Sequence, residues 1–168
     1  TAYMNYAQIR KYDIANGPGI RTSIFVTGCS INCKNCFNKE YQNPNFGKVW
    51  TDQTTNEVIS YLKRDEISGL TILGGEPFES AHELTDIVRV IKTQVNKEIW
   101  IYSGYSFENL IANKIQKDLL KEIDVLVDGP FIESKKDLKL RFRGSSNQRI
   151  IDVKNSLINN DIVLLNGY

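Results

Sequence analysis

Short apolar segments alternate with helical patterns along most of this chain, and that alternation limits the folds open to it. Apolar segments of strand length occur at residues 23–27, 70–73, 98–102 and 125–127. Helical patterns are expected at residues 58–62, 84–95 and 106–122, the last with a break near Asn113. Strand–helix alternation of this kind predicts an α/β protein whose parallel sheet is covered by helices, either open or part of a barrel.

Local signals predict where several elements begin. Residues 54–57 and 80–83 each place a Ser or Thr three residues before a Glu, which predicts two helix-capping boxes. Residues 4–13 are expected to form an extended arm or a first edge strand, and residues 37–49 a loop. Two final strands are predicted around Ile150 and over residues 162–165.

All three cysteines, Cys29, Cys33 and Cys36, fall within eight residues, just after the first apolar strand. Three thiols cannot all pair as disulfides, and the C-x3-C-x2-C spacing suits a loop folded round a metal centre. A zinc site would need a fourth donor, and the only histidine of the chain is His82. A cubane iron–sulfur cluster takes one thiolate on each iron, so three thiolates would leave one iron open to a substrate or cofactor.

Polar or glycine-rich residues follow each of the predicted parallel strands. They are the cysteine segment, residues 74–77 (GGEP), Ser103-Gly104 and Asp128-Gly129. Because ligands of parallel-sheet folds gather at the carboxyl ends of the strands, these segments are expected to meet on one rim. Ser103 and Asp128 either face a ligand there or only shape their turns. His82, at the start of a helical pattern, is interpreted as a solvated helix residue.

Composition argues against several functional classes. The 168 residues are 41% hydrophobic and 24% charged, as expected for one globular domain covering residues 1–168, of which residues 1–3 are interpreted as a cloning remnant. A net charge of +1 gives no field that would attract nucleic acid or an anionic membrane. No apolar run approaches the roughly 20 residues that span a bilayer. Without a recognisable signal peptide or paired cysteines, a cytoplasmic location is expected.

The cysteine triad, followed by GGEP after the next strand, resembles the radical S-adenosylmethionine (SAM) superfamily. Further stretches narrow the resemblance: residues 16–21 (NGPGIR), 100–105 (WIYSGY), 125–129 (VLVDG) and 143–149 (RGSSNQR). Together they resemble the family that activates anaerobic (class III) ribonucleotide reductase, over about residues 5–152. One position departs from the superfamily pattern, because Asn35 stands where many members have an aromatic residue before the third cysteine. Phe37 could partly replace that residue.

The resemblance implies a parallel-sheet partial (β/α) barrel of the radical SAM type and a [4Fe-4S] cluster held by the three catalytic cysteines. It implies that SAM chelates the open iron, with the GGEP segment at its amino group. The implied cofactor-binding residues are Asn35, Cys36, Phe37, Gly74, Gly75, Glu76, Ser103 and Asp128. An electron from the cluster would cleave SAM to a 5′-deoxyadenosyl radical, which would take a hydrogen atom from a glycine of the partner reductase. An electron donor such as flavodoxin or a thioredoxin-like system is implied as a second partner.

Other interpretations stay open at this point. SAM cleavage could serve another glycyl-radical enzyme, or a small molecule as in queuosine-type biosynthesis. The three cysteines with an Asp or His could instead hold zinc in an interaction module, or the cluster could only transfer electrons. Arg141, Arg143 and Arg149 either bind a phosphate or a partner's acidic surface, or form a dispersed basic face.

Overall fold

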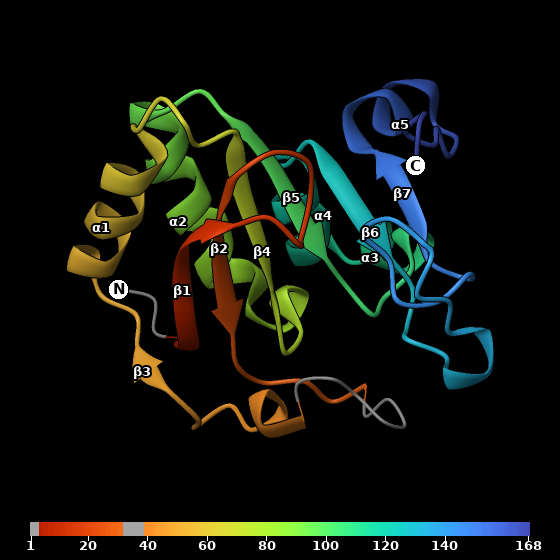
Figure 1. Cartoon of the computed structure of the whole chain (residues 1–168), viewed down its shortest axis with the longest axis horizontal. Coiled ribbons are helices and arrows are strands. Elements are labelled where there is room, and N and C mark those ends of the chain that lie inside the picture. The colour runs from red at the N-terminus through yellow and green to blue at the C-terminus, as the bar shows by residue number, and fades with distance from the viewer. Residues whose placement is uncertain (1–3, 32–38) are drawn as a thin grey trace.

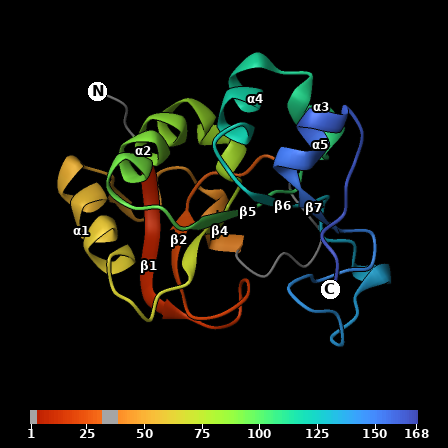
Figure 2. The same ribbon diagram turned by 90° about the horizontal axis from the view of Figure 1, so that it is seen from above.

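The computed structural model describes residues 4–31 and 39–168, which form one seven-stranded sheet with helices packed on one face (Figures 1 and 2). The strands are β1 Asn5–Asp13, β2 Arg21–Val26, β3 Lys48–Val49, β4 Gly69–Gly74, β5 Glu98–Tyr102, β6 Val125–Asp128 and β7 Arg149–Asp152. Their order across the sheet is β3-β1-β2-β4-β5-β6-β7, so the sheet is open, with β3 and β7 at its edges.

The predicted parallel arrangement holds for the centre of the sheet only. Strands β2, β4, β5 and β6 run parallel to one another. On the flanks, β1 pairs antiparallel with β2 and with β3, and β7 pairs antiparallel with β6. Strand β1 is therefore not an edge strand, because the two-residue strand β3 pairs with its first residues. A strand of two residues is too short to show the period-two pattern that predicts strands.

The helices of the described residues are α1 Asp52–Leu62, α2 Ala81–Gln94, α3 Phe107–Ile111, α4 Lys114–Leu120 and α5 Val153–Asn159. The capping box of helix α1 lies three residues before the predicted one at residues 54–57. Thr51 and Thr54 cap the helix reciprocally, and the Thr54 hydroxyl takes the place that a glutamate has in the usual capping box. The break predicted near Asn113 is confirmed, since the Asn113 side chain accepts from the Gln116 amide as the cap of α4.

The predicted box at residues 80–83 does not form. Ser80 makes no capping hydrogen bond, because the short 3-10 helix η2, Pro77–Ser80, leads directly into α2. The cap of η2 is Glu76, whose carboxylate accepts from the Phe78 amide at 2.9 Å. Helical structure therefore begins within the GGEP segment, at Pro77, and the carboxylate of Glu76 that caps it is buried.

Two other segments differ from the sequence prediction. The described part of residues 37–49 contains a second 3-10 helix, η1 Lys39–Gln42, as well as β3. The strand around Ile150 is confirmed as β7, but residues 162–165 contribute only an isolated bridge, between Leu164 and Ile151. Helix α5 fills the interval between them and was not indicated by periodicity because it is only seven residues long.

Alternation along the strands divides the apolar residues between the two faces of the sheet. One face buries the larger core against the helices, with members such as Ile72 of β4 and Ile101 of β5. A smaller cluster of Trp100, Val125, Val127 and Ile150 lies on the other face. Successive strand residues point to opposite faces, which is why neighbours in β5 belong to different clusters. Residues 129–148, blue in Figure 2, cross this helix-free side near β6 and β7.

The NGPGIR stretch serves the fold through a buried arginine. Arg21 is 1% exposed, and its guanidinium donates to the Thr71 hydroxyl at 2.8 Å and to the carbonyl oxygens of Leu70 at 3.0 Å and Glu98 at 3.1 Å. A Cβ atom at Gly17 would lie 2.7 Å from the Arg21 side chain. These contacts join β2 to β4 and β5 at the ends opposite the cysteine segment, so the stretch fixes the sheet that carries the strand ends.

Candidate functional site

A cavity of about 520 Å³ opens on the helix-free face at the carboxyl ends of the parallel strands. Its lining includes Cys29 after β2, Gly74, Gly75 and Glu76 at the end of β4, Ser103 and Gly104 after β5, and Gly129 after β6. The predicted convergence of four strand ends on one rim is therefore confirmed for the described residues. The other predicted cluster and cofactor residues, Cys33, Asn35, Cys36 and Phe37, lie outside the described part of the chain.

Backbone hydrogen bonds fix Cys29 beside the GGEP segment. The Cys29 amide donates to the Gln42 carbonyl at 3.0 Å, and the Gly28 amide donates to the Tyr41 carbonyl at 2.7 Å. The Gly28 carbonyl in turn accepts from the Glu76 amide at 2.7 Å. The end of β2, the end of η1 and the end of β4 therefore meet in one hydrogen-bonded junction at the cavity.

The two glycines of GGEP are required by this junction. Gly74 has a φ of +115°, and a Cβ there would collide with the backbone of Val26. A Cβ at Gly75 would lie 2.6 Å from the carbonyl oxygens of both Gly28 and Tyr41. Backbone cannot yield as a flexible side chain can, so both positions need glycine for packing, while their own backbone remains on the cavity lining.

Glu76 joins the end of β4 to the end of β5. Its carboxylate is 1% exposed; Oε1 accepts from the Gly104 amide at 2.7 Å, and Oε2 accepts from the Ser103 hydroxyl at 2.9 Å. Burial raises the pKa of Glu76 to about 7, although the hydrogen bonds from Gly104, Phe78 and Ser103 act in the opposite direction. Ser103 and Gly104, predicted only as a polar strand end, are therefore held by the GGEP glutamate.

Glu79 ties the cysteine segment to the same rim and was missed in the sequence. Its carboxylate accepts from the Ser30 hydroxyl at 2.6 Å and amide at 3.1 Å, and from the Tyr105 hydroxyl at 2.8 Å. The spacing offers a signal that could have found it. Residues three apart eclipse each other in a 3-10 helix, and Glu79 follows Glu76 by three positions at η2.

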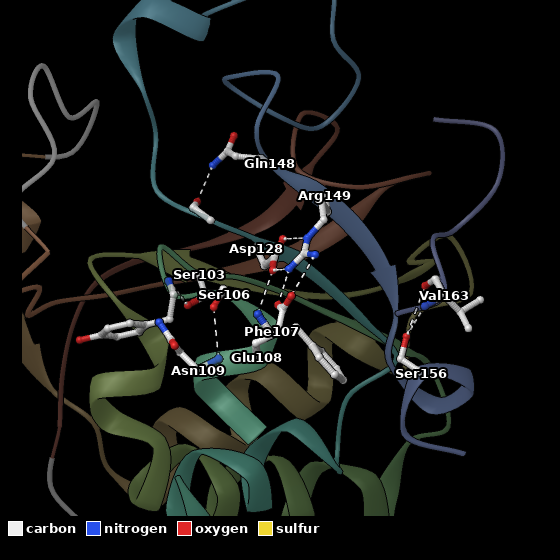
Figure 3. Close-up of polar contacts among 12 residues, drawn as sticks. Ser103, Ser106, Phe107, Glu108, Asn109, Asp128, Gln148, Arg149, Ser156 and Val163 are labelled. Atoms are coloured by element: carbon white, nitrogen blue, oxygen red, sulfur yellow. Dashed lines mark hydrogen bonds and ion pairs between the residues drawn. The ribbon is translucent and has the colours of Figure 1, made fainter. Parts of the chain in front are cut away.

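Asp128 does not line the cavity. Its carboxylate, 2% exposed, accepts from the Phe107 amide at 2.8 Å and pairs with Arg149 at 3.0 Å and 2.6 Å (Figure 3). Arg149 also pairs with the exposed Glu108 at 2.6 Å, and these two partners raise the pKa of the guanidinium further above its usual value. These contacts tie the end of β6 to the start of α3 and to β7, and neither of them lies in the turn before Gly129-Pro130.

The cavity has a polar side on which Arg143 was a candidate in the sequence and Tyr102 was not. Tyr102 and Arg143 line it, and the Tyr102 hydroxyl and Arg143 Nε are buried without a hydrogen-bond partner in the described residues. Burial raises the pKa of Tyr102, so its hydroxyl is a donor at neutral pH. Buried polar groups are normally hydrogen-bonded, so these two donors are exceptions among the residues of the lining. The strand alternation offered one signal, since Tyr102 lies two residues after Trp100 and so shares its face.

The remaining candidate residues take no part in this arrangement. His82 is exposed on the first turn of α2, which confirms its interpretation as a solvated helix residue. Within residues 4–31 and 39–168, no three His, Cys, Asp or Glu side chains are placed to share a metal ion. None of the helices found there has the length and apolar composition needed to cross a membrane.

Comparison with known proteins gives a consistent result. The model of a family described as a 4Fe-4S single cluster domain matches residues 15–151. The anaerobic ribonucleoside-triphosphate reductase-activating protein of Enterobacteria phage T4 is 38% identical over 150 residues, which are 88% of this chain and 93% of that protein. Proteins of the same name from Vibrio cholerae and Escherichia coli K12 are 39% and 37% identical, over 88% and 86% of this chain and 97% and 96% of their own lengths.

This chain belongs to the anaerobic ribonucleoside-triphosphate reductase-activating protein family.

Membership of the activating-protein family bears on whether the cysteines hold an iron–sulfur cluster or zinc. The matching family model describes a 4Fe-4S domain, which favours an iron–sulfur centre over a zinc module. The match also extends from the NGPGIR stretch to β7, so the whole set of strand ends that line the cavity lies inside it.

Proposed function

We propose that this chain is the activase of an anaerobic ribonucleotide reductase and generates the glycyl radical of that enzyme by reductive cleavage of SAM. The observation that carries the proposal is the meeting of Cys29 with the GGEP backbone and Ser103-Gly104 on one cavity. Its relatives are named for the activation of this reductase. Cytoplasmic action, with a flavodoxin or a thioredoxin-like system as electron donor, belongs to the same proposal.

The donor set suits a [4Fe-4S] cluster. Cys29 lies on the cavity, and Cys33 and Cys36 follow it within seven residues, so three thiolates are available and one iron is left for an external ligand. When bound, the reduced cluster supplies one electron that breaks the S–C5′ bond of SAM, giving methionine and a 5′-deoxyadenosyl radical that takes a hydrogen atom from the reductase glycine. The chain itself binds, orients and shields the reactants.

The residues around the cavity have separate parts in this proposal. Glu76 Oε1 accepts one hydrogen bond from the described residues, and a carboxylate oxygen can accept two, so it retains a position for the ammonium group of SAM. The backbone of Gly74 and Gly75 lies beside that position. Tyr102 and Arg143 supply donors for oxygen atoms of the cofactor or of the glycine-bearing segment. The apolar side chains of Phe25 and Leu73, which also line the cavity, exclude water from it.

Electron paramagnetic resonance tests the proposal. Protein reconstituted anaerobically with iron and sulfide, then reduced, should give a cluster signal that shifts when SAM is added. Addition of the reductase should then produce a glycyl-radical doublet. A cluster signal that ignores SAM would indicate an electron-transfer protein, and zinc without acid-labile sulfide would indicate an interaction module; either result would overturn the proposal.

A further inference from the structure

A loop next to the cavity exposes basic and apolar side chains that do not line the cavity. We define the outer loop as residues 133–141 (ESKKDLKLR), which contain four basic and two acidic residues. The loop begins with the short 3-10 helix η3, Glu133–Lys135 (Figure 1). Leu140 at its end lines the cavity, whereas Leu138, two residues earlier, is 88% exposed. One short segment therefore faces the cavity and the solvent at once.

The RGSSNQR stretch braces this loop. Gln148 Oε1 accepts from the amides of Gly144 at 2.8 Å and Ser145 at 3.1 Å, and its Nε2 donates to the Gly129 carbonyl at 3.1 Å. The Ser145 hydroxyl accepts from the Ile132 amide at 3.2 Å, and the Ser146 amide donates to the Lys135 carbonyl at 2.9 Å. The stretch is thus held against Gly129 and Ile132, and it contacts the outer loop at Lys135 and through the Asp137 amide, which donates to the Gly144 carbonyl at 3.3 Å. Contacts that order the loop in advance reduce the ordering cost of binding through it.

The outer loop exposes both an apolar and several basic side chains. Leu138 has the largest exposed fraction among the large hydrophobic residues that the structure describes. Lys135 and Lys139 beside it are exposed, and neither belongs to an ion pair identified in residues 4–31 and 39–168. Arg141 is exposed as well, with its guanidinium 5.1 Å from the ring centroids of Phe142 and Tyr168. Leu138 and the lysines beside it give the loop one apolar contact and several cationic ones, and charges at an interface steer the approach of a partner.

We infer that the outer loop is the docking surface for an acidic segment of the reductase that also carries an apolar side chain for Leu138. The inference rests on the proposed function. A protein that delivers a glycine into the cavity must approach its lining, and Leu140 of the outer loop belongs to that lining. The net charge of +1 gives the whole chain no general attraction for nucleic acid or an anionic membrane, which favours a local contact with a protein.

Charge reversal separates docking from cofactor chemistry. The test variants are Lys135→Glu/Lys139→Glu and Leu138→Ser, and the control is Lys114→Glu/Lys121→Glu on α4, which lies on the opposite, helix-covered side (Figure 2). Dissociation constants for the purified anaerobic reductase are measured at about 0.05 M and about 0.3 M salt. We expect each test variant to bind about tenfold more weakly at low salt, and the double variant to lose most of its salt dependence. The control should bind like wild type.

The same samples report on the proposed function independently. Cleavage of SAM by the chemically reduced protein without reductase should be equal in wild type and all variants, because Lys135, Leu138 and Lys139 do not line the cavity. Wild-type affinity and salt dependence in both test variants would overturn the docking surface while leaving the activase proposal intact. Absence of SAM cleavage in wild type would instead overturn the activase proposal.

Discussion

Replacement of Asp128 by Asn distinguishes a residue that shapes the fold from one that binds the cofactor. The amide can keep an oxygen where Oδ2 accepts from the Phe107 amide and from Arg149 Nη2. Its NH2 group then faces Arg149 Nε, which donates to Oδ1 at 3.0 Å, so one charge-assisted hydrogen bond becomes a contact between two donors. A hydrogen bond to a charged group contributes about 1.5–3 kcal/mol, and Arg149 keeps Glu108 as a second partner. We therefore expect the free energy of unfolding to fall by about 2 kcal/mol.

Urea unfolding followed by circular dichroism under anaerobic conditions measures this change. The matched control is Glu108→Gln, which removes the exposed partner of the same guanidinium and should cost less than about 1 kcal/mol. The affinity of folded Asp128→Asn for SAM should equal that of wild type, because Asp128 is absent from the cavity lining. Equal losses of stability in the two variants, or a tenfold loss of SAM affinity without loss of stability, would refute the reasoning.

Three further predictions concern the junction at the end of β4. Gly75→Ala should lower the free energy of unfolding by about 1–3 kcal/mol, because the new Cβ meets two carbonyl oxygens at 2.6 Å. The control in urea unfolding is Gly104→Ala, where φ is not positive and the new Cβ clashes only with the flexible end of the Ile31 side chain. The pKa of Glu76 is raised from 4.5 to about 7, so its contribution to stability is present below pH 4.5 and is lost as pH rises through 7. The unfolding free energy of wild type minus that of Glu76→Gln should therefore fall by roughly 3 kcal/mol between pH 4.5 and 8, and a constant difference would contradict this. Glu79→Ala should expose the Ser30 amide, and hydrogen exchange there should accelerate by about tenfold; unchanged exchange would show that the carboxylate does not hold the segment.

The central sheet and the place of the site could be predicted from the sequence because both depend on local signals. The periodicity that gives α2 extends over many residues, and a glycine or polar residue directly after an apolar run marks a strand end wherever the strand lies in the sheet. Once four such ends belong to parallel strands, their meeting at one edge follows from geometry. Strand β3 escaped prediction because it is only two residues long, and the antiparallel direction of β1 and β7 escaped it because local patterns do not show which way a strand runs.

The internal partners of the site residues could not be predicted, since each partner comes from a distant part of the chain. Asp128 was expected to face a ligand or to shape its turn, whereas its partners are Phe107 and Arg149, each 21 residues away. Glu76 and Ser103 are 27 residues apart, so no local pattern could show that the carboxylate is already partly engaged. The residue types at the strand ends were informative about chemistry, whereas the division of their hydrogen bonds between protein and ligand required the fold.

The junction between Gly28–Cys29 and Tyr41–Gln42 has a consequence for how a metal centre is assembled. Bringing the two ends of a segment together costs conformational entropy, and small zinc-dependent domains meet that cost with the free energy of metal binding. Here two backbone hydrogen bonds hold both ends of the cysteine-bearing segment beside a sheet stabilised by its own core. The hydrogen bonds of the chain therefore meet part of the entropic cost of closing the loop, and we expect loss of the inorganic centre to leave the surrounding sheet folded.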